Sequence, residues 1–315
     1  MKICNVIMYH YVRNLKYSFF PDIKGLEVTE FENHIKYLLK EKFQFVTIPE
    51  IINACTCGGE LPSKSVLLTF DDAYIDHYIN VFPRLNEYGI QGCFYVPVKA
   101  IQNHEVLDVN KIHFVLAACE NKQNIIKRLY SLLDEYRKEF DLQSNEYYYN
   151  KLAVASRWDT PEVIFIKRLL QVELPEKIRN IFTSILFKEY VTDNEAAFSR
   201  ELYMNEAQLK CMYRNGMHIG AHGYDHYWLD SLDEKQQESE ILKSLKFLES
   251  LGIDTQKNGW TLCYPYGAYD AKLINILKKY HCQLAFTTEP EKAIINYENM
   301  LRLSRLDAND VYNIK

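Results

Sequence analysis

Short apolar runs alternate with amphipathic helical segments at both ends of the chain, and this alternation constrains the fold more than any other feature. The runs that we expect to be buried strands lie at 3–11, 45–48, 65–70, 92–96, 217–220, 260–264, 282–286 and 301–306. The helices predicted between them lie at 29–39, 76–88, 233–251 and 270–280. Strands that alternate with helices in this way form parallel α/β sheets or barrels.

The middle of the chain departs from this alternation. There the sequence predicts almost no strand, and the expected helices lie at 112–118, 125–140, 162–170 and 177–190. We therefore expect an α/β part made of 1–103 and 211–315, and a helical insertion over 104–210. An insertion at the carboxyl ends of strands overhangs the sites that form there, so a lid or specificity subdomain is one interpretation. A packing appendage or a dimer interface is the alternative.

Two short polar motifs follow predicted strands. Asp71 and Asp72 come directly after the run 65–70, and His222 and His226 follow another short strand. The i, i+4 spacing of the histidines predicts that both lie on one face of a helical turn. One Asp with two His is a complete protein ligand set for a catalytic zinc, and a spare carboxylate beside it could take the proton of the zinc-bound water.

Each motif also has an ordinary structural explanation. Asp pairs at strand ends are common in turns and helix N-caps, and surface helices carry His-x-x-x-His by chance. The position of both motifs after strands favours the functional interpretation, because catalytic groups in α/β barrels lie at the carboxyl ends of the strands.

The motifs, taken in order, resemble those of the polysaccharide deacetylase family, also called the NodB-homology or carbohydrate esterase 4 family. The matching stretches are Thr69–Asp72 for its TFDD motif, His222–His226 for H-S/T-x-x-H with Gly223 in place of Ser or Thr, Tyr264–Gly267 for its P-Y-G loop, and Ile7–Val12 for an M-Y-H-x-V strand. The resemblance covers about 4–100 and 200–310.

This resemblance implies a distorted (β/α) barrel of the NodB deacetylase type. It implies a bound Zn²⁺ or another divalent metal, with Asp71 as the catalytic base. The metal ligands that it implies are Asp72, His222 and His226. The residues that it places at the substrate and the oxyanion are Tyr264, Pro265 and Tyr266, with a backbone N–H near Tyr266 facing the developing charge.

Apart from Gly223, the sequence departs from the family pattern in two places. The Arg that precedes the P-Y-G loop and orients the base is replaced by Cys263, and Arg305 or Arg302 could take that role from another strand. The Leu-x-His near the C-terminus, which supplies a general acid, is missing because no His follows His281. His10 lies where the first strand should end, so we consider it as the acid or as a group that orients the substrate. A core histidine bonded to the backbone is the alternative.

Composition excludes some partners and favours one compartment. A net charge of −5 gives no general reason to expect nucleic acid or an anionic membrane as a partner. We find no signal peptide and no apolar run long enough to span a membrane. Three of the eight Cys, at positions 4, 93 and 263, lie in apolar runs, where Cys behaves as a small hydrophobic residue. A reduced, cytoplasmic protein fits these features.

We therefore expect a metal-dependent hydrolase that removes an N-acyl group, with N-acetyl as the first expectation, from an amino-sugar or oligosaccharide intermediate in surface-glycan synthesis. A sugar N-deformylase or O-deacetylase is chemically close. A different class is a catalytically reduced, metal-bearing carbohydrate-binding or scaffold protein, which the missing Arg and His motivate and the intact Asp-Asp-His-His set opposes. The sequence leaves the sugar, its carrier and the oligomeric state open.

Overall fold

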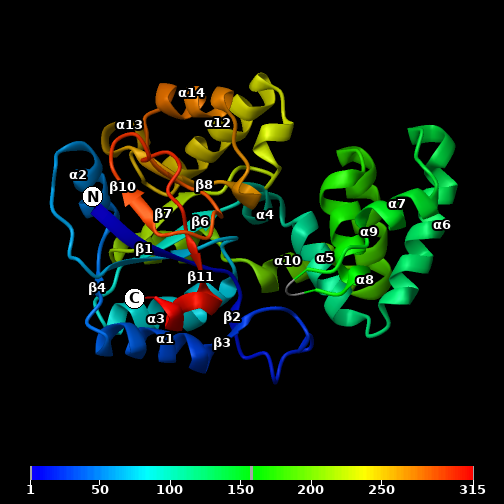
Figure 1. Cartoon of the computed structure of the whole chain (residues 1–315), viewed down its shortest axis with the longest axis horizontal. Helices are drawn as coiled ribbons and strands as arrows, with labels where there is room; N and C mark the ends of the chain where they lie inside the picture. Colours follow the sequence, from blue (N-terminus) through cyan, green and yellow to red (C-terminus); the bar gives the residue numbers. More distant parts are fainter. Residues whose placement is uncertain (1, 157–158, 315) are drawn as a thin grey trace. The chain divides into compact units, whose positions relative to one another are not determined.

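The computed structural model describes residues 2–156 and 159–314. Contacts within the chain group it into two compact units (Figure 1). The first, which we call the barrel unit, comprises Met1–Asn14, Gly25–His104 and Ser199–Lys315. The second, the helical unit, comprises Leu15–Lys24 and Glu105–Phe198. All residues that the sequence suggests for the site belong to the barrel unit.

The barrel unit is built on one curled sheet. Its strands are β1 (Lys2–Tyr9), β4 (Gln44–Phe45), β5 (Ser65–Phe70), β6 (Gly92–Val96), β7 (His218–Ala221), β8 (Trp260–Cys263), β9 (Cys282–Phe286), β10 (Ala293–Ile295) and β11 (Leu306–Asp307). Their order is β10-β1-β5-β6-β7-β8-β9, with β4 paired to β5 and β11 paired to β1. Only β10 runs antiparallel to its neighbour among these described strands, so the carboxyl ends of the others lie at one rim. A separate parallel pair joins β2 (Val12–Arg13) to β3 (Leu26–Glu27).

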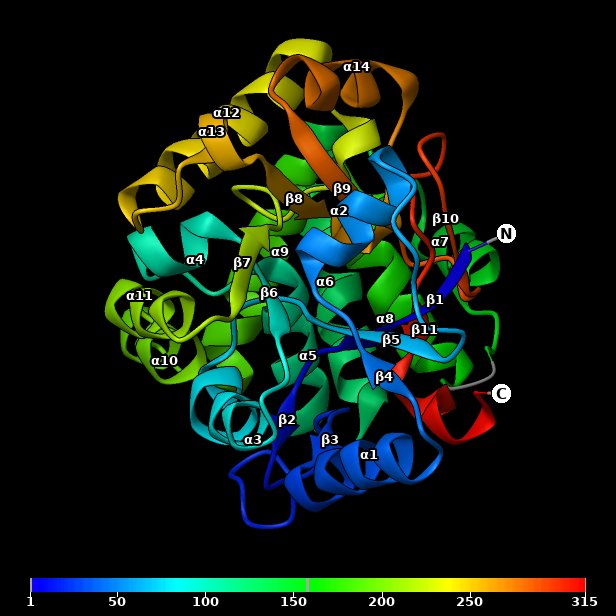
Figure 2. The same ribbon diagram turned by 90° about the vertical axis from the view of Figure 1, so that its left-hand side faces the viewer.

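Helices of the barrel unit surround this sheet, except α2, which lies within the ring of strands in the view of Figure 2. They are α1 (Val28–Lys40), α2 (Ile48–Thr56), the π-helical turn η1 (His77–Val81), α3 (Phe82–Glu87), α4 (Val98–Asn103), α11 (Glu206–Arg214), α12 (Glu234–Ser250), α13 (Thr255–Asn258), α14 (Ala271–Lys279), and the 3₁₀ turns η3 (Leu229–Ser231), η4 (Pro265–Gly267) and η5 (Ala308–Asn313). Helix α10 (Glu195–Leu202) crosses the boundary between the two units.

The segment 303–307, which we call the closing segment, pairs with strands at both edges of the sheet. Leu303 pairs with Phe286 at the end of β9, while Leu306 and its neighbour in β11 pair with Ile7 and Met8 of β1. The sheet is therefore a distorted (β/α) barrel, as the sequence predicts.

The interior of this barrel is apolar. Fully buried side chains that share one cluster come from β1, β5, β6, β8 and β9, and include Cys4, Leu67, Cys93, Cys263 and Leu284. Helix α2 contributes Ile48 and Ile51 to the same cluster, and Figure 2 shows it in the middle of the ring of strands. Helix α2 thus closes one end of the barrel. The rim formed by the carboxyl ends of the strands remains available for a functional site.

Three predicted ranges are wrong in detail. The run 45–48 is a strand only at Gln44–Phe45, because Thr47 and Glu50 form a capping box that starts α2 at Ile48. The helix predicted at 76–88 begins as the π-helical turn η1 and ends at Glu87. The run 301–306 is an isolated bridge at Leu303 followed by the two residues of β11, because it changes its pairing partner from β9 to β1.

The helical unit is organised around apolar helix faces. Its helices are α5 (Asp108–Ala118), α6 (Lys122–Phe140), α7 (Asn145–Leu152), α8 (Pro161–Arg168), the π-helical turn η2 (Leu169–Glu173) and α9 (Glu176–Tyr190). Leu129, Phe165 and Phe182 from three of these helices are fully buried. The buried Lys111 on α5 is neutralised by Glu195, at 3.1 Å. Helices at each range predicted in this part of the chain are therefore present, with ends that differ by up to four residues.

The eight cysteines lie within the described residues, and each of them is free. None of the described helices combines the length and the apolar composition that a membrane crossing needs.

We predict that the metal-free protein loses stability as the pH falls from about 6.5, partly through His77. Burial lowers the pKa of this fully buried imidazole to about 3, and one of its ring nitrogens lies 2.8 Å from the His10 carbonyl. Protonation at lower pH therefore favours the unfolded chain, in which the pKa is about 6.5. Urea unfolding in chelator at pH 7 to 5 should show a stability loss that is shallower for His77→Gln, by up to about 1.4 kcal/mol per pH unit. Parallel curves for the two proteins would contradict this role.

Candidate metal and catalytic site

The rim of the barrel carries the polar motifs. His10 follows β1, the two adjacent Asp follow β5, His222 follows β7, and the loop Tyr264–Gly267 follows β8. Since these strands run parallel, residues far apart in the sequence meet at one rim.

Asp72, His222 and His226 form a cluster that could hold a metal ion. One Asp72 oxygen, Oδ1, lies 3.5 Å from His222 Nε2 and 3.4 Å from His226 Nε2. All three side chains are buried, and their ligand atoms lie within 4.8 Å of one another. Oδ1 is buried without a hydrogen-bond partner among the described residues, an arrangement that a cation would satisfy. The residues therefore fit a divalent ion of the kind that Asp and His bind.

The two histidines are neutral at neutral pH, which suits metal binding. Burial lowers the pKa of both imidazoles to about 4, so at neutral pH each has a nitrogen lone pair to offer a metal. His222 Nδ1 lies 2.7 Å from the Cys263 carbonyl, which makes Nδ1 the donor and turns Nε2 toward Asp72.

The histidines lie on a loop, and the predicted helical turn is wrong. The backbone is left-handed at Gly223, with φ of 73°, and at His226, with φ of 57°, which a helix does not allow. The two rings are nevertheless close, with centroids 4.8 Å apart. The i, i+4 spacing thus predicts the proximity of the rings but not the backbone that produces it.

Two helices hold this loop in place. The buried Glu240 of α12 accepts hydrogen bonds through Oε2 from the backbone N–H groups of Tyr224 and Asp225, at 2.8 and 2.9 Å. From the other side, the first N–H groups of α4 donate to the carbonyls of Gly223 and Tyr224. Glu240 is not evident from the sequence, since nothing distinguishes it from the surface Glu residues of the same helix.

Asp71 is paired with Arg305. Nη1 and Nη2 of this arginine donate to the two carboxylate oxygens at 2.9 and 2.8 Å, and both side chains are almost completely buried. Burial alone would raise the pKa of the Asp71 carboxyl, but the charge of Arg305 holds it well below its usual range. Of the two arginines that the sequence offers, the structure brings Arg305 to Asp71, whereas Arg302 is exposed and donates to Asn299.

Two further side chains of the site, Tyr74 and Cys263, lie beside Asp72 and Asp71. The Tyr74 hydroxyl donates to Asp72 Oδ2 at 2.5 Å, and burial followed by the Asp72 charge raises the Tyr74 pKa well above its ordinary value. The Cys263 thiol, which stands at the position of the missing Arg, lies beside Asp71, and burial keeps it protonated by raising its pKa. Tyr74 was not predicted, although its position two residues after Asp72 could have suggested it.

His10 is exposed at the rim, which excludes the alternative of a buried core histidine. A positive charge on its ring would lower the pKa of both Asp71 and His226, so the ring lies in the same electrostatic neighbourhood as the polar cluster. The backbone carbonyl of His10 accepts a hydrogen bond from the buried His77 ring.

The P-Y-G loop divides its residues between the site and the core. Tyr266 has a left-handed backbone, with φ of 58°, and its ring packs against His226 with centroids 4.8 Å apart. The ring of Trp228, which the sequence did not suggest, stacks on the ring of Tyr266, with centroids 4.5 Å apart. Pro265 is buried. The Tyr264 side chain is fully buried and donates to the Leu301 carbonyl at 2.8 Å, so it is not available to a substrate.

A family model described as polysaccharide deacetylase matches residues 58–137 and 182–285, which is more than half of the chain. The chain therefore belongs to the polysaccharide deacetylase family, as the motifs indicate. YxkH of Bacillus subtilis (strain 168), which carries a provisional name as a polysaccharide deacetylase, is 20% identical over 264 residues, or 84% of this chain and 59% of YxkH. The chain thus spans less than two thirds of that relative.

Solved structures show the same fold. The Streptococcus pyogenes deacetylase PplD in complex with acetate has a TM-score of 0.58 at 15% identity, with 97% of this chain and 92% of that chain covered. IcaB from Ammonifex degensii has a TM-score of 0.57 at 18% identity, with coverage of 99% and 95%. A de-N-acetylase from Aggregatibacter actinomycetemcomitans has a TM-score of 0.55 at 14% identity, with coverage of 97% and 94%. The barrel is accordingly of the NodB type.

We predict that Glu240→Ala weakens metal binding by about 10- to 100-fold, because the histidine loop loses the acceptor of two backbone N–H groups. Glu240→Gln keeps one acceptor oxygen and should retain most of the affinity. The exposed Glu234 lies on the same helix, so Glu234→Ala is the matched control. Titration of the metal-free variants with Zn²⁺ measures the effect. Equal affinities for Glu240→Ala and Glu234→Ala would show that the loop holds its shape without this carboxylate.

Proposed function

We propose that this chain is a metal-dependent deacetylase that removes an N-acyl group, with N-acetyl as the expected acyl, from an amino sugar in surface-glycan synthesis. The observation that carries the proposal is the buried Asp71–Arg305 pair directly beside the buried Asp72–His222–His226 cluster. The names of the solved relatives support the acyl group, since one is a de-N-acetylase and another was solved with acetate.

Asp71 is the proposed catalytic base. Arg305 keeps its carboxylate ionised and fixes the position of both oxygens, so that it can accept a proton in one defined direction. Asp72, His222 and His226 would hold a divalent ion, expected to be Zn²⁺. This ion would polarise the acyl carbonyl and lower the pKa of a water, which must be acidic before a carboxylate of low pKa can accept its proton. Tyr74 and the Cys263 carbonyl orient two of these ligands by hydrogen bonds.

The loop around Tyr266 is the proposed binding site for the acyl group. We assign the oxyanion contact to a backbone N–H near Tyr266, because the ring of this residue packs against His226 of the metal cluster. The stacked rings of Tyr266 and Trp228 beside His226 give the acyl group an apolar wall. Pro265 fixes the loop, while Tyr264 supports it from the core.

The same geometry argues against a catalytically reduced scaffold. The lost Arg of the family pattern is replaced by Arg305 from the closing segment, with a two-point contact to Asp71. A protein that only binds sugar has no need for a buried carboxylate held in this way, because the pair is costly to desolvate.

The compartment and the helical unit complete the proposal. The eight free thiols support a reducing, cytoplasmic setting, in which the substrate is a glycan intermediate. We assign to the helical unit, which approximates the 104–210 insertion, the role of a lid or specificity subdomain, on the ground that long insertions in barrels contribute to the site at the strand ends.

Asp71→Asn should retain metal and fold but lose acetate release by about 10²- to 10⁴-fold, because the base is gone. It should also unfold at a lower temperature, because the buried Arg305 loses its charged partner. Arg305→Gln should also be slow, because the carboxylate loses its orientation. Arg302→Gln is the matched control and should keep the wild-type rate on a monosaccharide N-acetyl glycoside. Acetate release, metal content and thermal unfolding are the measurements. An active Asp71→Asn enzyme with normal metal content would contradict the proposed base.

His10 is the proposed general acid or substrate-orienting group, because it is the exposed imidazole at the rim beside Asp71 and His226. His10→Ala should reduce kcat by about 10²-fold or more and alter the pH profile, with metal content unchanged. His281→Ala, which changes an exposed histidine just after α14, is the control, with the rates of both variants measured on a monosaccharide substrate. An unchanged rate and pH profile in His10→Ala would assign proton delivery to another group.

A further inference from the structure

We propose that a groove on the outside of the barrel unit, beside α14, binds the uncharged sugar residues that neighbour the deacetylated one. This inference rests on the proposed function and adds to it that the substrate is an oligosaccharide. The groove has a volume of about 1130 Å³ and is separate from the metal cluster in its lining residues. Its volume is enough for a drug-sized ligand, for which pockets measure roughly 300–1,000 Å³.

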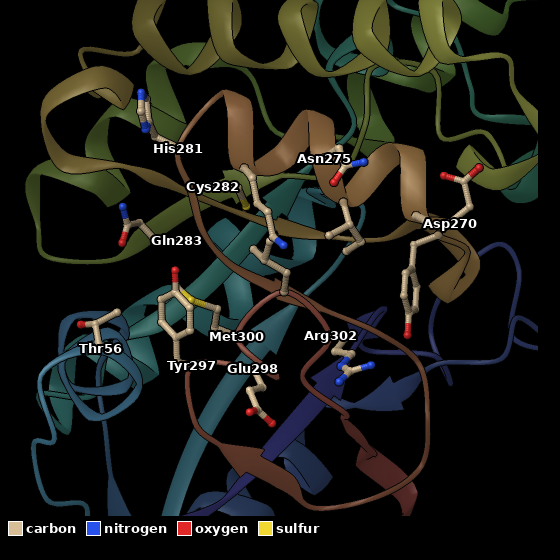
Figure 3. Close-up of a pocket in the computed structure, with 15 residues that line it drawn as sticks. Thr56, Asp270, Asn275, His281, Cys282, Gln283, Tyr297, Glu298, Met300 and Arg302 are labelled. Carbon is tan, nitrogen blue, oxygen red and sulfur yellow. The ribbon is translucent and has the colours of Figure 1, made fainter.

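The groove runs between α14 and the segment 296–302 (Figure 3). Asp270 and Asn275 lie along one side, and Tyr297, Glu298 and Arg302 along the other. The chain after β9 continues into β10 and the segment 296–302 without a helix, and this segment forms one wall of the groove.

The lining has the chemistry that recognises hydroxyl groups. Tyr269 and Tyr297 offer aromatic faces to the apolar side of a sugar ring, and 71% of Tyr297 is exposed. Among the described residues, the side chains of Lys278, Tyr297 and Glu298 have no hydrogen-bond or ionic partner. Donors and acceptors that are left open in a concave surface suit a ligand that both donates and accepts, as sugar hydroxyls do.

The charges of the groove favour an uncharged ligand over a phosphate. Lys278 and Arg302 bring positive charge, but Glu298 and Asp270 bring an equal number of carboxylates to the same lining. The Asp270 carboxylate is already bound to the Leu273 N–H and to Gln237, so it keeps its place and its negative charge. A diphosphate in the groove would meet both carboxylates, whereas a neutral glycan meets no repulsion.

The groove begins close to the P-Y-G loop along the chain, since its lining residue Tyr269 follows Gly267 by two positions. Tyr269 stacks on the buried Tyr264, with ring centroids 4.9 Å apart, and Tyr264 donates to the carbonyl of Leu301, which lines the groove. Tyr266, at the metal cluster, and Tyr269 are three residues apart, so their Cα atoms are at most about 10 Å apart. A glycan with its acetyl group at Tyr266 can therefore reach Tyr269 with a neighbouring sugar.

The test compares a short and a long substrate. A Tyr297→Ala/Arg302→Ala double variant should raise KM about tenfold or more for a β-1,4-linked N-acetylglucosamine pentamer, with kcat unchanged, because the binding contacts lie away from the reacting atoms. Both constants for the methyl glycoside of N-acetylglucosamine should stay at wild-type values. Tyr88→Ala, which changes an exposed tyrosine outside the groove lining, is the control. Equal KM changes for both substrates, or none for either, would overturn the proposal.

Direct binding separates this inference from the proposed function. Calorimetry with Asp71→Asn protein should show pentamer binding that the added double substitution weakens about tenfold. If the wild type releases acetate from neither substrate, the proposed function fails, while the calorimetric result still decides the groove. Inhibition by inorganic pyrophosphate that Lys278→Ala relieves would identify a phosphate site and overturn the proposal of a neutral glycan.

Discussion

The buried ion pair between Asp71 and Arg305 is the interaction on which the rest of the site depends. Arg305 is completely buried, and its donors reach the Thr287 carbonyl, the Thr69 hydroxyl and both oxygens of Asp71. Loss of one partner of such a pair leaves a buried charge uncompensated, which costs about 3–5 kcal/mol. The pair therefore joins β5 to the closing segment of the barrel and, at the same time, fixes the carboxylate beside the metal cluster.

The same pair explains how the chain accommodates Cys263. A thiol at that position cannot hold a carboxylate by two hydrogen bonds, and burial keeps it neutral by raising its pKa. The guanidinium instead comes from the segment between Leu303 and β11, which crosses from one edge of the sheet to the other. Because Arg305 lies in this segment, its side chain can reach Asp71 at the end of β5.

Sequence reasoning recovers the features that depend on local pattern. Apolar runs predict the buried strands, and the residues directly after them, Asp71, Asp72 and His222, lie at the rim because parallel strands end together. The backbone of the histidine loop was not predictable from the His spacing, since its shape depends on left-handed residues and on Glu240 from a distant helix. Trp228 was missed for a similar reason, because it contacts Tyr266 from a distant part of the sequence. Tyr74 was also missed, although its contact with Asp72 is local.

The central claim is that the rim holds a divalent metal next to an oriented carboxylate. The metal content of the purified protein, measured after dialysis against a metal-free buffer, tests this most directly. We expect about one divalent ion per chain, with Zn²⁺ as the expected ion, and its loss in a His222→Ala/His226→Ala double variant that remains folded. A folded double variant that binds as much metal as the wild type would contradict the account.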